Sequence, residues 1–168
     1  ATGVLERARA QLVEALGRSV FSTDGRSLPQ VVGDLLRERK LTFAAAESCT
    51  GGLVLQRMTD IPGSSDYVKG GVVAYSNELK MQLLGVDAAL LKAHGAVSEP
   101  VAAAMVDGIR ERTGAGVCVS ITGIAGPGGG SETKPVGTVV IGVLVPGRPL
   151  SVRTYLFPGN REMVRLQS

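Results

Sequence analysis

Two segments in which an apolar run breaks into glycine and hydroxyl residues constrain the fold of this chain most. One is Ala-Glu-Ser-Cys-Thr-Gly-Gly at 46–52, and the other, at 120–137, contains Gly-Pro-Gly-Gly-Gly. Each follows an apolar run that predicts a buried strand, and the first segment opens a helix. A turn of this kind exposes a hydroxyl nucleophile beside backbone N–H groups that lack partners. The pattern suits acyl transfer or anion binding, and the residues leave both open.

The apolar periodicity and the turn signals along the chain predict one α/β domain. Helices between the early strands favour parallel pairing, whereas Pro-Gly-Arg-Pro at 146–149 predicts an antiparallel hairpin of the last two strands. We expect a three-layer α/β/α fold with a mixed, roughly five-stranded sheet. The expected helix caps are Ser27, Asn77, Asp87 and Ser98. Strands are expected at 42–47, 67–76 (with a bulge at Gly70-Gly71), 117–122, 138–146 and 150–157, and helices at 4–17, 28–40, 50–59, 78–84, 88–93, 99–113 and the C-terminus.

The composition argues against several classes of protein. A net charge of +3 is too small to indicate a nucleic-acid surface, and three Tyr, three Phe and no Trp offer few stacking platforms. No apolar stretch is long enough to span a membrane. Cys49 and Cys118 lack metal-ligand spacing; we interpret them as buried apolar residues in a cytoplasmic protein. The length of 168 residues predicts a single domain with a helical extension at 1–27. The chain starts at Ala1 and stops inside an expected helix, so we expect a fragment whose C-terminal helix is truncated.

Ser48 is the candidate nucleophile. It lies at a strand-to-helix turn beside the amides of residues 49–52, which could stabilise an oxyanion. The competing interpretation is a helix N-cap, a commoner role for Ser, and the spacing alone slightly favours it. A serine nucleophile needs a base, but the only histidine, His94, precedes Gly95 at an expected helix end and is interpreted as structural.

Lys80 is the natural alternative base, because serine–lysine pairs are established variants of the catalytic triad. It lies one turn inside the helix that follows Tyr75-Ser76-Asn77. Partial burial would lower the pKa of its amine and let it accept the Ser48 proton, while Tyr75 could relay that proton or orient the amine. From the residues alone, a solvated lysine and a core tyrosine are the commoner roles.

The glycines at 123–130 and Arg161 are candidate anion-binding elements. Glycine lets the backbone approach a ligand and form N–H nests, and this segment is neither a Walker A loop nor a Rossmann fingerprint. The alternative is a plain mobile loop. Arg161 lies in the first turn of the last expected helix, where its charge opposes the helix dipole. A phosphate or carboxylate partner would rationalise it, and an exposed arginine is an equal alternative.

Four motifs occur in order along the chain: Ala-Glu-Ser-Cys-Thr-Gly-Gly (46–52), Gly-Val-Val-Ala-Tyr-Ser-Asn-Glu-Leu-Lys (71–80), Gly-Ala-Val-Ser-Glu-Pro-Val (95–101) and Ser-Ile-Thr-Gly-Ile-Ala-Gly-Pro-Gly-Gly-Gly-Ser-Glu-Thr-Lys-Pro-Val-Gly-Thr-Val (120–139). Together they resemble the C-terminal domain of the CinA family, which also occurs alone as a PncC-type nicotinamide mononucleotide deamidase. The resemblance runs from about Leu35 to Arg165.

The resemblance implies an amidohydrolase that converts nicotinamide mononucleotide and water to nicotinate mononucleotide and ammonia, without a metal or an organic cofactor. It implies Ser48 as nucleophile, Lys80 as base and Tyr75 as an assisting residue. The substrate phosphate is expected against the glycine-rich loop or Arg161. Proteins of this type tend to form homo-oligomers and often carry a preceding domain, so both are expected partners. The expected substrate-binding residues are Thr50, Gly51, Gly52, Asn77, Thr122, Gly123, Gly126 and Arg161.

The alternative function is a non-catalytic nucleotide-sensing module of a larger competence- or damage-inducible protein of the same family. A phosphatase or phosphotransferase that uses Ser48 is disfavoured, because the chain lacks the acidic metal ligands such enzymes usually need.

Overall fold

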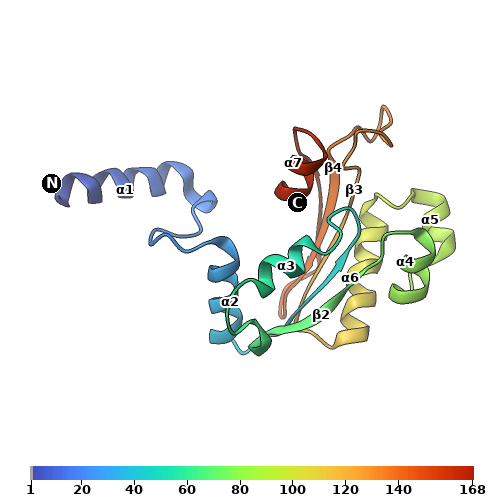
Figure 1. The fold of residues 1–168 in the computed structure, drawn as a ribbon, viewed down its shortest axis with the longest axis horizontal. Helices are drawn as coiled ribbons and strands as arrows, with labels where there is room; N and C mark the ends of the chain where they lie inside the picture. The colour runs from blue at the N-terminus through green and yellow to red at the C-terminus, as the bar shows by residue number, and fades with distance from the viewer. Residues whose placement is uncertain (1) are drawn as a thin grey trace.

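Five strands form one mixed sheet in the order β2-β1-β3-β4-β5, as Figure 1 shows for the computed structural model, which describes residues 2–168. Strand β1 pairs in parallel with β2 and with β3, whereas β3 pairs antiparallel with β4, and β4 with β5. The mixed sheet and its terminal hairpin confirm the prediction. The strands are β1 (Phe43–Glu47), β2 (Val68–Val73), β3 (Val117–Gly123), β4 (Thr138–Leu144) and β5 (Ser151–Leu156).

Helices cover both faces of the sheet, which gives the three expected layers (Figure 1). Helix α6 packs along β1, β3 and β4 on one face, and α4 and α5 pack against α6. Helices α2 and α3 cover the other face, which α7 also contacts through Val164. The helices are α1 (Thr2–Leu16), α2 (Leu28–Glu38), α3 (Leu53–Thr59), α4 (Asn77–Leu84), α5 (Ala88–His94), α6 (Glu99–Thr113) and α7 (Arg161–Gln167), with 3-10 turns η1 (Gly17–Ser19) and η2 (Ser64–Asp66).

Small side chains in the interior strand β1 let helices approach the sheet from both sides. Successive side chains of a strand point to opposite faces of the sheet. Accordingly, Ala44 and Ala46 pack with residues of α6, and Ala45 packs with residues of α2 and α3. All three alanines are fully buried, so β1 is covered on both faces up to the point where it ends.

Gly108 of α6 fixes the position of α4. A Cβ at position 108 would overlap the backbone of Leu84, the last residue of α4. The two helices therefore approach each other at backbone contact distance, which only glycine allows here. This contact matters for the site, because α4 carries Lys80.

Helix α3 begins at Leu53, whereas the sequence predicted a start at 50. Gly51 and Gly52 have φ angles of 64° and 97°, a backbone region that favours glycine. They form a tight turn after β1 that delays the helix by three residues. Ser48 therefore lies before a turn and not at the N-cap, which is Gly52.

The connection between strand β2 and helix α4 is longer than the sequence predicted. The strand ends at Val73, and Ser76 caps α4 by accepting a hydrogen bond from the Leu79 amide at 3.2 Å. Asn77, the predicted cap, is instead the first helical residue. The predicted bulge is confirmed, because pairing with β1 skips Lys69 directly before Gly70-Gly71. The other expected caps occupy N-cap positions: Ser27, Asp87 and Ser98.

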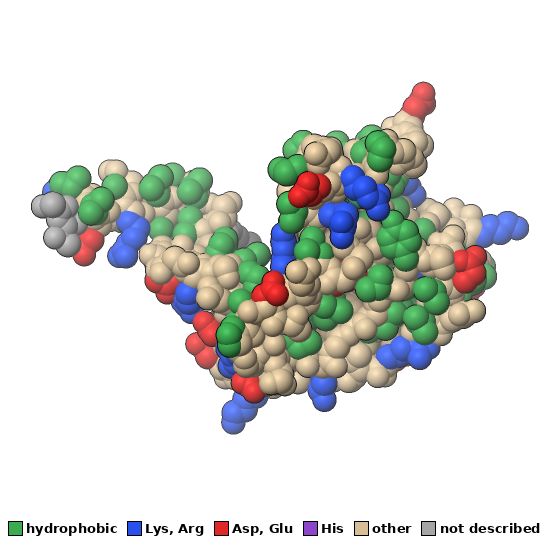
Figure 2. Space-filling view, viewed as in Figure 1, with side chains coloured by type: hydrophobic (Ala, Val, Ile, Leu, Met, Phe, Trp, Pro, Cys, Tyr) green, Lys and Arg blue, Asp and Glu red, His purple; other side chains and the backbone are tan. Residues whose placement is uncertain are grey.

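Helix α1 projects from the rest of the fold (Figures 1 and 2). The sequence predicted this helix at 4–17, and its apolar side chains form a row visible in Figure 2. They face solvent: Leu5, Leu12 and Leu16 are 72%, 59% and 55% exposed. Within residues 2–168, no helix has the length and apolar character needed to cross a membrane.

Candidate active site

A cavity of about 190 Å³ lies where β1 and β3 end. Parallel neighbouring strands end at the same edge of a sheet, and the sequence placed Ser48 and Thr122 at these two strand ends. The cavity also takes side chains from α4 and α7, so residues far apart in the chain meet there. It is lined by Ser48, Cys49, Tyr75, Lys80, Ala96, Val97, Thr122, Gly123, Ala125 and Arg161.

Ser48 and Lys80 meet in this cavity. Ser48 extends the pairing of β1 with β3, because its amide donates to the carbonyl of Ile121 at 2.9 Å. Lys80 lies in the first turn of α4 and reaches back toward the sheet. Its Nζ lies 3.0 Å from Ser48 Oγ. The spatial pair that the resemblance implied is therefore present.

The amine of Lys80 is held in a defined orientation. Besides Ser48 Oγ, its Nζ contacts the carbonyl oxygens of Ala74 at 2.8 Å and Tyr75 at 3.2 Å. A neutral amine has two N–H donors and one lone pair, so donation to the two carbonyls directs the lone pair at the Ser48 hydroxyl. This is the arrangement a general base requires.

Burial favours the neutral form of the Lys80 amine. Lys80 is 1% exposed, and burial lowers its pKa from the ordinary value of 10.5 because the charged form loses its water. The ion pairs of the described residues do not include Lys80, so no carboxylate offsets this effect. The solvated lysine considered from the sequence is thereby excluded.

Cys49 does not compete with Ser48 as a nucleophile. Burial raises the pKa of its thiol to about 11, so the sulfur stays protonated at neutral pH. Cys49 and Cys118 are both buried free cysteines, as the sequence predicted.

The turn after β1 offers fewer free donors than the sequence suggested. The Gly51 amide donates to the Ser48 carbonyl at 3.1 Å, and the Gly52 amide donates to Glu47 Oε2 at 3.0 Å. Of the four amides at 49–52, those of Cys49 and Thr50 donate to no oxygen acceptor in the described part of the chain, and both lie against the Cys49 thiol. An oxyanion at Ser48 would therefore rely on these two.

Arg161 and Tyr75 lie together at the mouth of the cavity. Arg161 donates through Nη1 to the Gly126 carbonyl at 2.9 Å and through Nη2 to the Tyr75 hydroxyl at 3.0 Å. It thus connects the glycine-rich loop with the segment that precedes α4. Tyr75 is 56% exposed, so it is not the core aromatic considered as its alternative role.

Several expected binding residues lie outside the cavity wall. Thr50 to Gly52 lie next to α7, where Arg165 Nη2 donates to the Thr50 carbonyl at 2.8 Å. Asn77 is exposed at the start of α4. Gly126 reaches the site only through the carbonyl that Arg161 contacts. A substrate contact by these residues stays a prediction.

Thr122 and His94 are both held by backbone contacts. Thr122 lines the cavity, and its Oγ1 donates to the Ala96 carbonyl at 2.9 Å. His94 ends α5 beside the cap Gly95, as predicted, and its carbonyl accepts from Lys134 Nζ at 2.8 Å. That contact ties the glycine-rich loop to the end of α5.

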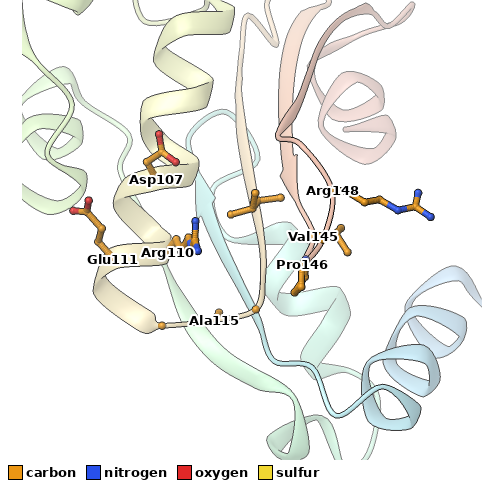
Figure 3. A pocket seen from close by; sticks show the side chains of 11 residues that line it. Asp107, Arg110, Glu111, Ala115, Val145, Pro146 and Arg148 are labelled. Atoms are coloured by element: carbon orange, nitrogen blue, oxygen red, sulfur yellow. The ribbon is translucent and has the colours of Figure 1, made fainter.

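A larger hollow of about 810 Å³ lies at the opposite end of β3 and β4, as Figure 3 shows. Its charged side chains do not converge, since Glu111 and Arg148 point away from each other on its two flanks. No group of three or more His, Cys, Asp or Glu side chains among residues 2–168 is placed to hold a metal ion. The hollow therefore has no arrangement of reactive groups like that around Ser48.

Comparison with known proteins identifies the family to which this fold and site belong. Residues 25–168 match the family model described as the CinA C-terminal domain. This chain belongs to the CinA family. Among solved structures, the competence/damage inducible protein CihA from Agrobacterium tumefaciens superposes on this CinA domain with a TM-score of 0.82 and 37% identity, covering 88% of this chain and 90% of that chain. A CinA superfamily protein from Escherichia coli gives a TM-score of 0.81 and 30% identity, covering 90% and 91%.

CinA-like proteins of mycobacteria are similar in sequence. One from Mycolicibacterium paratuberculosis is 56% identical over 169 residues, covering 96% of this chain and 38% of that protein. Another, from Mycobacterium tuberculosis, is 55% identical over 152 residues, covering 90% and 35%. The chain thus spans less than two-fifths of the length of these CinA relatives.

Proposed function

We propose that this CinA domain hydrolyses the carboxamide of nicotinamide mononucleotide, releasing ammonia and nicotinate mononucleotide. The observation that carries the proposal is the 3.0 Å contact between Ser48 Oγ and the buried Nζ of Lys80. Serine becomes a nucleophile when an adjacent base accepts its proton. Lys80 is the only side-chain nitrogen within hydrogen-bond distance of Ser48 Oγ in the described residues.

The reaction would begin with neutral Lys80 accepting the Ser48 proton while Oγ attacks the carboxamide carbon. The negative charge that develops on the carboxamide oxygen would be stabilised by the amides of Cys49 and Thr50. As the tetrahedral intermediate collapses, the C–N bond breaks and protonated Lys80 gives its proton to the departing nitrogen, which leaves as ammonia. Water, deprotonated by Lys80, would then cleave the acyl ester and restore Ser48.

The size and charge of the site favour a small anionic substrate. A cavity of about 190 Å³ suits a pyridine ring with its carboxamide better than a whole nucleotide. The ribose and phosphate would then extend to the mouth of the cavity. Arg161 lines the cavity wall there and would supply the positive charge, whereas Lys80 lies buried beside Ser48. A guanidinium recognises phosphate through charge-assisted hydrogen bonds, and glycine-rich backbone adds N–H donors nearby.

The test is an ammonia-release assay with nicotinamide mononucleotide on the wild type and on Ser48→Ala. We expect the variant to lose turnover while still binding the nucleotide in a calorimetric titration. Ser151→Ala, an exposed serine on β5, is the matched control and should retain full activity. Nucleotide binding without ammonia release by the wild type would favour the nucleotide-sensing module instead, and unchanged turnover in Ser48→Ala would remove Ser48 from the mechanism.

A further inference from the structure

Glu47 is a fully buried carboxylate without a cationic partner. Its side chain is 0% exposed, and the ion pairs of residues 2–168 do not include it. Burying an unpaired charge is costly unless hydrogen-bond donors replace its water. Three backbone amides do so here. Oε2 accepts from Gly52 at 3.0 Å and Val54 at 3.1 Å, and Oε1 accepts from Leu55 at 2.9 Å.

These three donors belong to the N-terminus of α3. The N-cap residue of this helix is Gly52, which has no side chain that could satisfy them. Glu47 supplies the missing cap from the strand that precedes the turn, and its negative charge lies at the positive end of the helix. The carboxylate therefore joins the end of β1 to the start of α3.

The bond between the Glu47 side chain and the Gly52 amide closes a ring around residues 48–51. Inside this ring, the Gly51 amide donates to the Ser48 carbonyl at 3.1 Å. The turn is thus held by two hydrogen bonds in addition to the strand and the helix at its ends. The two amides that directly follow Ser48 in this turn, those of Cys49 and Thr50, make no backbone hydrogen bond in the described residues.

We propose that Glu47 is a positioning residue for Ser48. Its carboxylate fixes the turn so that Ser48 Oγ faces Lys80 Nζ. It also occupies the amide donors of α3, which could otherwise compete with the amides of Cys49 and Thr50 for the oxyanion that develops on the carboxamide. The inference rests on the proposed function for its kinetic readout, although the bonding of the turn does not depend on the reaction.

Glutamate satisfies all three amides because both of its carboxylate oxygens accept hydrogen bonds. Glutamine has the same shape but one acceptor oxygen, so it can keep the bonds to Gly52 and Val54 while its NH₂ group faces the Leu55 amide. Leucine is similar in size and accepts no hydrogen bond. The two substitutions therefore form a graded series in which the acceptors are removed while the volume changes little.

The first experiment measures the reactivity of Ser48 without substrate, as the rate of covalent labelling by a fluorophosphonate probe. We expect labelling to slow about tenfold in Glu47→Gln, which loses one charge-assisted bond. It should slow about 100-fold in Glu47→Leu, where the turn is free to shift. The control is Glu111→Gln, an exposed glutamate on α6, which should label at the wild-type rate.

Turnover of nicotinamide mononucleotide separates positioning from general destabilisation. In Glu47→Gln we expect kcat to fall in parallel with labelling while KM stays within about twofold, because only the orientation of the nucleophile changes. A merely structural role would lower the melting temperature without changing the labelling rate of the folded fraction. Wild-type labelling and kcat in folded Glu47→Gln would overturn the inference.

One further measurement uses only the wild type and so does not depend on variants that fold. We expect NMR couplings across the hydrogen bonds from the Gly52 and Leu55 amide nitrogens to the Glu47 carboxylate carbon. Their absence would overturn the inference as well. If instead these couplings are present but wild-type Ser48 resists the probe, the proposed function fails while the role of Glu47 in the turn stands.

Discussion

Replacing Lys80 with methionine removes the proposed base and keeps an unbranched side chain of similar length. The wild-type Nζ contacts Ser48 Oγ at 3.0 Å and the carbonyls of Ala74 and Tyr75 at 2.8 and 3.2 Å. Loss of general-base catalysis costs about 10²- to 10⁴-fold in rate. Each buried carbonyl left unpaired costs about 1–3 kcal/mol of stability, but removal of a buried amine offsets part of this loss. We therefore expect a large fall in kcat and a modest fall in melting temperature.

The pH profile of the ammonia-release assay sharpens this prediction. Because burial lowers the pKa of Lys80 below 10.5 and only the neutral amine accepts a proton, wild-type kcat/KM should rise with pH through that pKa and then level off. Lys80→Arg is the matched variant, since a guanidinium stays charged at every accessible pH and should be as slow as methionine. A wild-type rate in either variant, or a wild-type profile that falls as pH rises, would refute the assignment of Lys80 as base.

Three further substitutions test separate parts of the structure. Gly108→Ala places a Cβ on the backbone of Leu84 and should destabilise the fold by about 1–3 kcal/mol in denaturant titration; unchanged stability would mean that α4 moves freely. Arg161→Ala should raise KM for the nucleotide about tenfold or more at similar kcat. An unchanged KM would show that Arg161 does not bind the phosphate. Thr50→Val removes a buried hydroxyl without a partner. It should raise the free energy of unfolding by about 1 kcal/mol and the melting temperature with it; a lower melting temperature than the wild type would show that the hydroxyl is hydrogen-bonded in solution.

The fold could be predicted from the sequence where local signals agree with the tertiary structure. Apolar runs of strand length, separated by helical periodicity, indicated the five strands and parallel pairing among the early ones, and Pro-Gly-Arg-Pro at 146–149 marked the terminal hairpin. The order of the strands in the sheet was not predicted. Boundaries at turns were harder. The start of α3 was placed too early because the small residues before it are compatible with a helix, and only the positive φ angles of Gly51 and Gly52 exclude one.

The candidate site was predictable in part, for the same physical reason. Strand ends place Ser48 and Thr122 at one edge of the sheet, but the depth of Lys80 depends on how closely α4 packs against α6. That packing is set by Gly108, which carried no signal in the helical pattern. Glu47 was missed as well, although a carboxylate at the end of an otherwise apolar strand is an available signal, because a buried acid must find donors.

The bridge that Arg161 makes between Tyr75 and Gly126 has a consequence for how the domain meets a charged ligand. The two terminal nitrogens of the Arg161 guanidinium each donate to an uncharged oxygen. An arriving phosphate would have to exchange at least one of these neutral contacts for an ionic one, at a position open to dissolved salt. Affinity should accordingly weaken as ionic strength rises, whereas the chemical step, which takes place around the buried Lys80, should proceed at the same speed in dilute and in concentrated buffer.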